Sequence, residues 1–260
     1  MAQVVQVNAY ADLETRWKAL RRRGDAAVRE VACAGAPRTL LCAEIGEAHL
    51  PAIAFASGVH GDEPAAPWAL LQLVEDRELD SRYSYRIWPC TNPSGYALGT
   101  RESIDGIDVN RSFGRGGQTP EARAIVMANR NRKFGISFDL HEDVDAAGFY
   151  CYEYGTPQLG HAMVDAVREA GFPVQDLGQC DLGAPFTAAQ LDDGVVRPSP
   201  ASEIDAIGGL SYNLSLARHA AQCALTLETP ARLPWDDRLS IHRIAVKAAI
   251  AAFAKQKNHG

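Results

Sequence analysis

The stretch Ile53-Ala-Phe-Ala-Ser-Gly-Val-His-Gly-Asp-Glu-Pro64 decides the fold. A short apolar run ends at a His-x-x-Glu pair, His60 and Glu63, with a glycine on either side of the histidine and a proline directly after the glutamate. This order is typical of a buried strand, a tight turn and a helix with proline at its first position. Imidazole and carboxylate both bind Zn²⁺, and this spacing lets both side chains reach one ion. Until a third ligand is found, a capping acid beside a turn histidine is the alternative.

The composition is that of an ordinary globular protein. The chain has 260 residues, of which 47% are hydrophobic and 22% are charged, and we expect residues 1–260 to form a single domain. Its net charge of −6 gives no electrostatic reason to expect a nucleic-acid partner. The N-terminus lacks the pattern of a signal peptide, and no apolar stretch reaches the roughly 20 residues that span a bilayer. We therefore expect a cytoplasmic protein with neither nucleic acid nor membrane as partner.

The cysteine pattern supports the same compartment. The six cysteines, at positions 33, 42, 90, 151, 180 and 223, are scattered, and none forms a Cys-x-x-Cys motif. A disulfide framework is uncommon in a chain of this length, whereas free thiols persist in a reducing cytoplasm. We expect buried free thiols.

Hydrophobic periodicity and turn residues predict strands that alternate with helices. The expected strands cover residues 27–34, 39–45, 51–57, 83–89, 135–141, 148–154 and 223–228, and the first two form an antiparallel pair. The expected helices cover residues 8–23, 64–76, 119–133, 157–170, 210–222 and 239–255. Residues 91–118 are expected to form a long functional loop, and residues 176–209 fit no single element. The alternation predicts an α/β architecture with a largely parallel or mixed central sheet.

Three predicted strands end on a side chain that can bind metal or move protons. His60 with Glu63 follows one strand, and His141 and Glu228 close two others. In open α/β sheets, sites form outside the carboxyl ends of the strands, so these groups would face one crevice. Two histidines and a glutamate are a recurring ligand set for catalytic zinc, which leaves one position for water. Without the other motifs, His141 would be interpreted as a core histidine; Glu228 needs a partner because it closes an apolar strand.

Five short motifs in this order resemble the carboxypeptidase A-like zinc metallopeptidases. They are Gly58-Val-His-Gly-Asp-Glu63, Asn92-Pro-x-Gly-Tyr96, Asp108-Val-Asn-Arg111, Asp139-Leu-His141 and Thr226-Leu-Glu228. The Gly-Asp-Glu form of the first motif is most similar to bacterial relatives, including murein peptide amidases and the succinylglutamate desuccinylase and aspartoacylase branch. The resemblance implies a three-layer sandwich, with a mixed, mostly parallel twisted sheet flanked by helices.

The resemblance also implies the metal site and the base. One Zn²⁺ per chain would be held by His60, Glu63 and His141, and Glu228 would be the general base. A bound Zn²⁺ lowers the pKa of its water to about 7, and a nearby carboxylate can take that proton and deliver it to the leaving amine. Asp108 would hydrogen-bond the far nitrogen of His60 and fix its tautomer.

The substrate groups follow from the same resemblance. Asn110 and Arg111 would hold the C-terminal carboxylate of the substrate, and Arg101 would polarise the scissile carbonyl and stabilise the oxyanion. A planar guanidinium binds a carboxylate through two parallel hydrogen bonds, which suits this role. The alternative for both arginines is an ordinary surface position, where most arginines lie.

Two features depart from the family pattern. Asp62 stands where the digestive carboxypeptidases carry an arginine, which leaves the substrate open. The segment before Gly208-Gly209 lacks the tyrosine that the family has there.

We expect the pocket for the C-terminal side chain of the substrate between Leu177 and Asn213. Four further histidines are expected to be structural: His49, His161, His219 and His242.

These features predict a zinc metallocarboxypeptidase that removes a C-terminal amino acid from peptides by attack of zinc-bound water, with Glu228 as base. The first alternative is an N-acyl amino acid hydrolase of the same fold, similar to succinylglutamate desuccinylase or aspartoacylase. The second is a non-catalytic domain that binds peptide C-termini. Its substrate partner is accordingly a peptide or an N-acyl amino acid.

Overall fold

One mixed sheet of nine strands runs through the part of the chain that the computed structural model describes, which is residues 10–114, 116–176, 190–198 and 209–257. The strand order is β1-β2-β4-β3-β5-β9-β6-β8-β7, and the central strands β4, β3, β5 and β9 are all parallel. The bounds are β1 (Ala27–Val31), β2 (Leu40–Ile45), β3 (Ala52–Ser57), β4 (Ser84–Trp88), β5 (Phe134–Asp143), β6 (Tyr150–Gly155), β7 (Gln190–Asp192), β8 (Val195–Arg197) and β9 (Ala221–Pro230).

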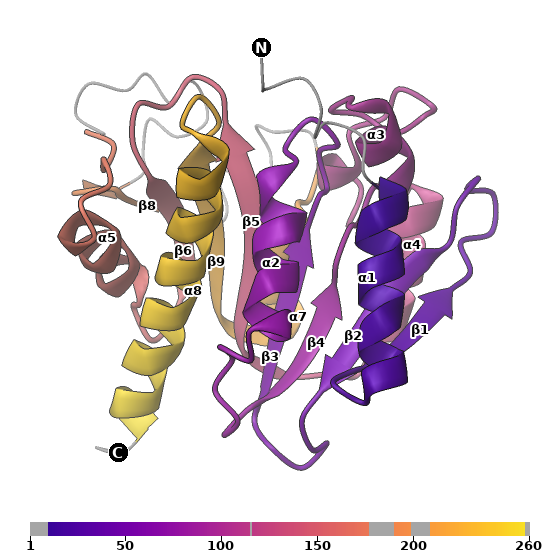
Figure 1. Cartoon of the computed structure of the whole chain (residues 1–260), viewed down its shortest axis with the longest axis horizontal. Coiled ribbons are helices and arrows are strands. Elements are labelled where there is room, and N and C mark those ends of the chain that lie inside the picture. The colour runs from indigo at the N-terminus through magenta and orange to yellow at the C-terminus, as the bar shows by residue number, and fades with distance from the viewer. Residues whose placement is uncertain (1–9, 115, 177–189, 199–208, 258–260) are drawn as a thin grey trace.

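Helices cover both faces of this sheet (Figure 1). In this view α1, α2 and α8 lie in front of the sheet, and α4 and α7 lie behind it. The bounds are α1 (Tyr10–Arg23), α2 (Ala65–Glu75), α3 (Pro93–Leu98), the short 3₁₀ helix η1 (Val109–Arg111), α4 (Pro120–Asn129), α5 (Gly160–Glu169), α7 (Tyr212–His219) and α8 (Trp235–Lys257). None of the helices in the described ranges combines the length and apolar character needed to cross a membrane. The predicted fold class is confirmed.

Each face of the sheet packs its own apolar core, because side chains on a strand alternate between the two faces. On the face of α2 and α8, the rings of Phe55 and Phe138 stack with centroids 4.8 Å apart. On the opposite face, the smaller Ala54 and Ala56 pack with Trp88 against residues of α4 and α7. The five cysteines within the described residues are free and buried, as predicted, and Cys180 lies outside them.

The structure differs from the prediction at the ends of two central strands. β5 does not end at His141 but continues to Asp143, and β9 continues past Glu228 to Pro230. Parallel pairing between the two strands extends through these residues, and this pairing is not visible in a single sequence. The predicted loop of residues 91–118 contains α3 and η1, and the unassigned segment contains the β7–β8 hairpin.

His242 on α8 makes stability depend on pH. The side chain is fully buried, and its Nδ1 lies 3.4 Å from the Thr229 hydroxyl. Burial lowers the pKa of His242 to about 3. Because the unfolded chain binds this proton near pH 6.5 and the folded chain does not, stability is fully present above pH 6.5 and is lost as the pH falls toward 3.

We therefore expect His242→Leu to flatten the pH dependence of the unfolding free energy between pH 4 and 6.5. The wild-type protein should lose up to about 1.4 kcal/mol more per pH unit than the variant. Urea unfolding of both proteins in the presence of a chelator measures this difference, because groups common to the two proteins cancel. Equal slopes would contradict the assignment.

Candidate metal centre and active-site cleft

The turn after β3 requires glycine because it packs tightly against α3. Gly58 has a φ of +60°, which disfavours other residues. A Cβ on Gly61 would lie 2.0 Å from the carbonyl carbon of Gly95, and the Gly61 amide donates to the Thr100 carbonyl at 2.9 Å. The glycines of the opening stretch therefore fix the backbone position from which the His60 and Glu63 side chains extend.

Asn92 connects this turn to the segment that carries Arg101. Its side-chain oxygen accepts a hydrogen bond from the Gly95 amide at 2.9 Å and caps α3. Its side-chain nitrogen donates to the carbonyls of Val59 at 3.2 Å and of Arg101 at 3.3 Å. The Asn92 side chain therefore holds the turn that carries His60 and the segment that carries Arg101 together by hydrogen bonds.

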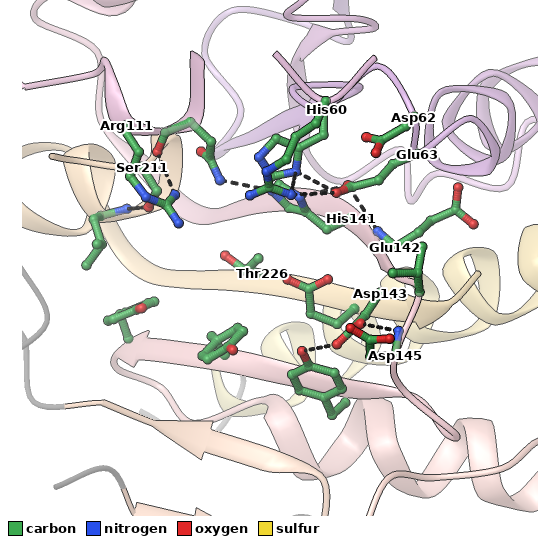
Figure 2. Close-up of a pocket in the computed structure, with 18 residues that line it drawn as sticks. His60, Asp62, Glu63, Arg111, His141, Glu142, Asp143, Asp145, Ser211 and Thr226 are labelled. Atoms are coloured by element: carbon green, nitrogen blue, oxygen red, sulfur yellow. Dashed lines mark hydrogen bonds and ion pairs between the residues drawn. The ribbon is translucent and has the colours of Figure 1, made fainter. Parts of the chain in front are cut away.

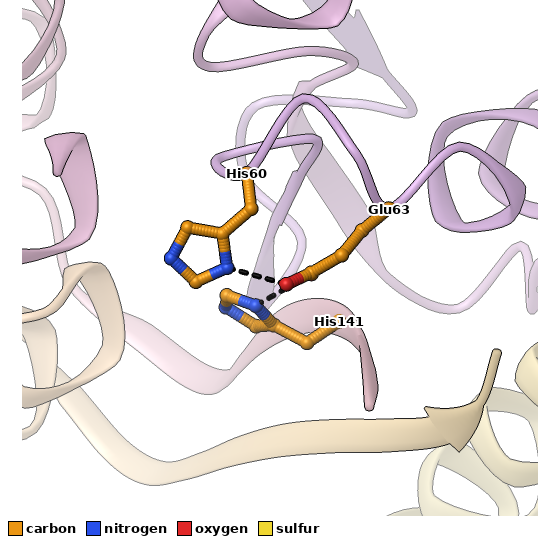
Figure 3. Close-up of side chains that lie close together, drawn as sticks. All are labelled: His60, Glu63 and His141. Carbon is orange, nitrogen blue, oxygen red and sulfur yellow. Dashed lines mark hydrogen bonds and ion pairs between the residues drawn. The ribbon is translucent and has the colours of Figure 1, made fainter. Parts of the chain in front are cut away.

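His60, Glu63 and His141, called here the His-Glu-His group, lie together at the carboxyl ends of β3 and β5 (Figure 3). One potential ligand atom of each lies within 4.8 Å of the other two, and all three side chains are buried. Both imidazoles turn Nδ1 toward the Glu63 carboxylate, at 2.9 Å from His141. The parallel pairing of β3 with β5 brings residues 78 positions apart into this contact.

The far nitrogens of both imidazoles face carboxylates. Nε2 of His60 lies 3.4 Å from Asp108, and Nε2 of His141 lies 3.2 Å from Asp139. Asp139 was not predicted, although it stands two residues before His141 and therefore on the same face of the strand. It is fully buried, and neither of its oxygens has a hydrogen-bond partner within the described residues, so His141 is its counter-charge.

Charges inside the group strongly shift its pKa values. Burial opposes ionisation of Glu63, but the charges of His141 and His60 outweigh burial and hold its pKa below the usual range. Burial also opposes protonation of His141, but Asp139 and Glu63 raise its pKa well above the usual value. Each member is thus compensated by the others, as a buried charge requires.

This donor set fits a zinc ion. Two imidazole nitrogens and one carboxylate on converging side chains are a zinc ligand set that leaves a coordination position open. Carboxylates on the opposite ring nitrogens orient metal-binding imidazoles, and Asp108 and Asp139 stand at those positions. His60, Glu63 and His141 would therefore hold the ion through Nδ1 atoms and a carboxylate oxygen.

Glu228 stands beside the group on the neighbouring strand. It is the direct pairing partner of His141 in the parallel ladder between β5 and β9, so both side chains project from the same face of the sheet. Burial raises the pKa of Glu228 to about 8, and the charge of Glu63 adds to this shift. A cation bound nearby acts in the opposite direction and favours the carboxylate.

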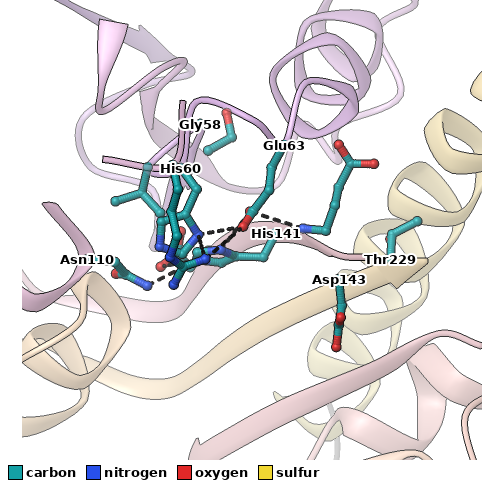
Figure 4. A network of polar contacts seen from close by, with 12 residues as sticks. Gly58, His60, Glu63, Asn110, His141, Asp143 and Thr229 are labelled. Atoms are coloured by element: carbon teal, nitrogen blue, oxygen red, sulfur yellow. Dashed lines mark hydrogen bonds and ion pairs between the residues drawn. The ribbon is translucent and has the colours of Figure 1, made fainter. Parts of the chain in front are cut away.

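The predicted substrate-binding residues line the same cleft. Arg101 lies beside the His-Glu-His group, with its guanidinium 3.2 Å from Nδ1 of His60, and its side chain is 43% exposed. The Asn110 side-chain oxygen accepts a hydrogen bond from the Tyr212 amide, and its nitrogen lies 3.4 Å from Nε2 of His141 (Figure 4). If that Nε2 carries the proton facing Asp139, the Asn110 amide is left to donate to a ligand. Arg111 follows Asn110 and is partly exposed.

The cleft has a volume of about 350 Å³ (Figure 2). Its wall includes three tyrosines that sequence analysis did not single out, at alternate positions on β6 and hence on one face of that strand. They are Tyr150, Tyr152 and Tyr154, and Ser211 and Thr226 also line the cleft. The alternation of Tyr-Cys-Tyr-Glu-Tyr was a signal for a half-exposed strand face, but not for which face borders the site. Most of the pocket predicted between Leu177 and Asn213 lies outside the described residues.

Glu142, the residue after His141, points to the other face of the sheet. It accepts hydrogen bonds from Arg238 of α8 at 2.6 and 2.8 Å and from the Ala65 amide at the start of α2 at 2.8 Å. Its backbone amide also donates to Glu63 at 3.1 Å. This buried ion pair therefore connects two helices to the strand that carries His141.

We expect Asp139→Asn to weaken zinc binding by about 10- to 100-fold, because the neutral amide polarises the His141 ring less. Competition with a chromophoric chelator measures the dissociation constant directly. Asp165 is exposed on α5, so Asp165→Asn is the matched control and should bind zinc like the wild type. Unchanged affinity in Asp139→Asn would show that the buried carboxylate does not act through His141.

The fold and the His-Glu-His group together define a zinc carboxypeptidase-like protein. Residues 49–195 match the family described as the succinylglutamate desuccinylase/aspartoacylase catalytic domain, and the chain belongs to this family. The match covers all the predicted site residues except Glu228.

Solved structures share the fold across almost the whole chain. A candidate metallopeptidase from Shewanella amazonensis SB2B superposes with a TM-score of 0.75 at 23% identity, covering 93% of this chain and 92% of that one. Carboxypeptidase A from Helicoverpa armigera has a TM-score of 0.66 at 16% identity, covering 94% and 71%. In sequence, carboxypeptidase SOL1 from Arabidopsis thaliana is 27% identical over an alignment of 119 residues that covers 38% of this chain and 24% of that protein. The chain thus aligns with about a quarter of this plant relative.

Proposed function

We propose that the protein is a zinc-dependent carboxypeptidase that releases the C-terminal amino acid of a peptide. The observation that carries this proposal is the shared cleft, in which the His-Glu-His group, Glu228, Arg101, Asn110 and Arg111 all contribute to the lining. A metal site alone fits many hydrolases. A metal site with a carboxylate base and two arginines fits hydrolysis of an amide next to a carboxylate.

Each side chain has a defined task in this proposal. Arg111, with the Asn110 amide, binds the terminal carboxylate and so sets which amide bond is cleaved. Arg101 donates to the scissile carbonyl oxygen as negative charge develops on it. Glu228 accepts a proton from the attacking water and passes it to the leaving amine. The zinc ion, when bound, supplies a Lewis acid that polarises the carbonyl and lowers the pKa of water.

The family match favours a second candidate, an N-acyl amino acid hydrolase. The name of the matching family includes succinylglutamate desuccinylase and aspartoacylase, which cleave an amide whose amine side is an amino acid. Arg111 would bind that amino acid in the same way. The two candidates differ only on the acyl side of the bond, which is a peptide in one and a simple acid in the other.

The test compares two substrate panels with the zinc-loaded protein. One panel is a library of short peptides and the other is a set of N-acetyl and N-succinyl amino acids, and mass spectrometry detects the released amino acid. Release from peptides supports the carboxypeptidase, and turnover of the acyl amino acids alone would replace it with the second candidate. A preparation with stoichiometric zinc that cleaves neither panel would favour a binding domain.

A further inference from the structure

The cleft has different charges at its two ends (Figure 2). Arg111 lies at one end of the view, Asp62, Asp143 and Asp145 lie toward the other, and the His-Glu-His group lies between them. Groups that are well separated in a projection are at least that far apart in space, so these are two distinct ends. A substrate that bridges them has a fixed direction.

Of the three aspartates at the acidic end, all within the described residues, Asp62 is the one that makes no hydrogen bond or ion pair with another residue. Asp143 accepts hydrogen bonds from two backbone amides and, at 2.7 Å, from the Tyr150 hydroxyl. Asp145 pairs with Arg232 at 3.3 Å. Asp62 is exposed, and its carboxylate accepts a hydrogen bond from its own backbone amide. Asp62 is therefore available to a ligand.

The direction of the substrate places its acyl side near Asp62. In the proposed reaction the terminal carboxylate lies at Arg111 and the scissile carbonyl lies at the His-Glu-His group. The chain on the acyl side then continues toward the end where Asp62 stands, directly next to Glu63 in sequence. In a dipeptide or tripeptide, the free α-ammonium lies within one or two residues of the scissile bond. It would meet Asp62 before any other uncommitted carboxylate in the lining.

The volume of the cleft agrees with a short substrate. At about 350 Å³ it lies near the lower end of the range for small-ligand pockets, roughly 300–1,000 Å³. A short peptide fills such a space, and its two termini then fall near the two ends of the cleft.

We propose that Asp62 is a specificity-determining residue that selects substrates with a positive charge on the acyl side, namely di- and tripeptides with a free N-terminus. This inference rests on the proposed carboxypeptidase function. The same carboxylate repels an acyl group that ends in a carboxylate, such as succinyl. Asp62 thereby separates the two candidate reactions of this cleft by charge.

The test measures kcat/KM for one tripeptide in three forms: with a free, an N-acetylated and an N-succinylated terminus. The zinc-loaded wild type should prefer the free form over the acetylated form by about 10-fold, equivalent to about 1.4 kcal/mol, and should cleave the succinylated form most slowly. Asp62→Asn should bring the free-to-acetyl ratio close to 1, and Asp62→Lys should favour the succinylated form. Because every substrate meets the same metal, an effect of Asp62 on the neighbouring Glu63 cancels in the ratio.

Asp165→Asn, which changes an exposed side chain of α5, is the control and should keep the wild-type ratio. The inference is overturned if the wild type cleaves the three forms equally, or if Asp62→Asn keeps the preference for the free form. Failure of the proposed function gives a different result, because no amino acid would then be released from any peptide form while N-acyl amino acids are cleaved.

Discussion

Glu228→Gln is expected to lower kcat on a peptide substrate by about 10²- to 10⁴-fold while zinc stays bound. Gln keeps the size and hydrogen-bonding capacity of Glu228 but cannot take a proton from water, and this range is typical of a lost general acid–base. Glu228 pairs with His141 across two strands and is not a member of the His-Glu-His group, so the ligand set stays intact. Kinetics and metal analysis of the same preparation test both halves of this expectation.

His141→Ala is the matched control, because His141 is a member of the His-Glu-His group and pairs with Glu228 between β5 and β9. It should lose both zinc and activity, whereas Glu228→Gln should lose activity alone. Full activity in Glu228→Gln would sink the assignment of Glu228 as base. Loss of zinc in that variant would instead make Glu228 part of the metal site.

Arg238→Ala is expected to lower the free energy of unfolding by about 3–5 kcal/mol. The Glu142 side chain is fully buried, and Arg238 is its partner through two hydrogen bonds. Removing one partner of a buried ion pair leaves an uncompensated charge, which is far more costly than the pair itself is stabilising. Urea unfolding at pH 7 with a chelator measures this loss without a contribution from bound metal.

The double variant Arg238→Met with Glu142→Gln separates the buried charge from lost packing. Gln can still accept the hydrogen bond from the Ala65 amide, and Met fills much of the space of the arginine stem, so most of the stability should return. If the free energy of unfolding of Arg238→Ala falls by less than about 1 kcal/mol, water reaches Glu142 and the ion pair does not hold the two helices to the strand.

The short motifs were the most informative part of the sequence, because each has a local physical reason. Gly58 and Gly61 are needed for a turn with positive φ and close backbone contact, and Asn92 is needed as a cap with two further hydrogen bonds. The positive φ of Gly58 and the cap by Asn92 are local and can be read from one sequence, whereas the contacts of Gly61 with Gly95 and of Asn92 with Val59 join distant segments. The expectation that Asp108 lies near His60 came from the family resemblance, because the two residues are far apart in the chain.

Other parts of the site could not be predicted because they depend on long-range pairing. The tyrosines of β6 border the cleft because that strand pairs antiparallel with β9, which places Tyr150 opposite Glu228. Glu142 meets Arg238 because α8 packs beside α2, at a sequence separation of 96 residues. Periodicity shows that a residue is buried or exposed, but it does not identify the element that it packs against.

The sequence by itself determined the α/β class, the order of most elements and the turn that carries His60 and Glu63, because hydrophobic period and glycine turns are local properties; His141 was added to this pair by the order of the motifs along the chain. The tertiary structure decided the strand order, the registration of His141 with Glu228, and the partners of Asp139 and Glu142. It also placed the exposed Asp62 in the lining of the cleft, away from Arg111. These features arise only when segments far apart in the chain pack together, since contacts of that kind leave no periodic pattern in either segment.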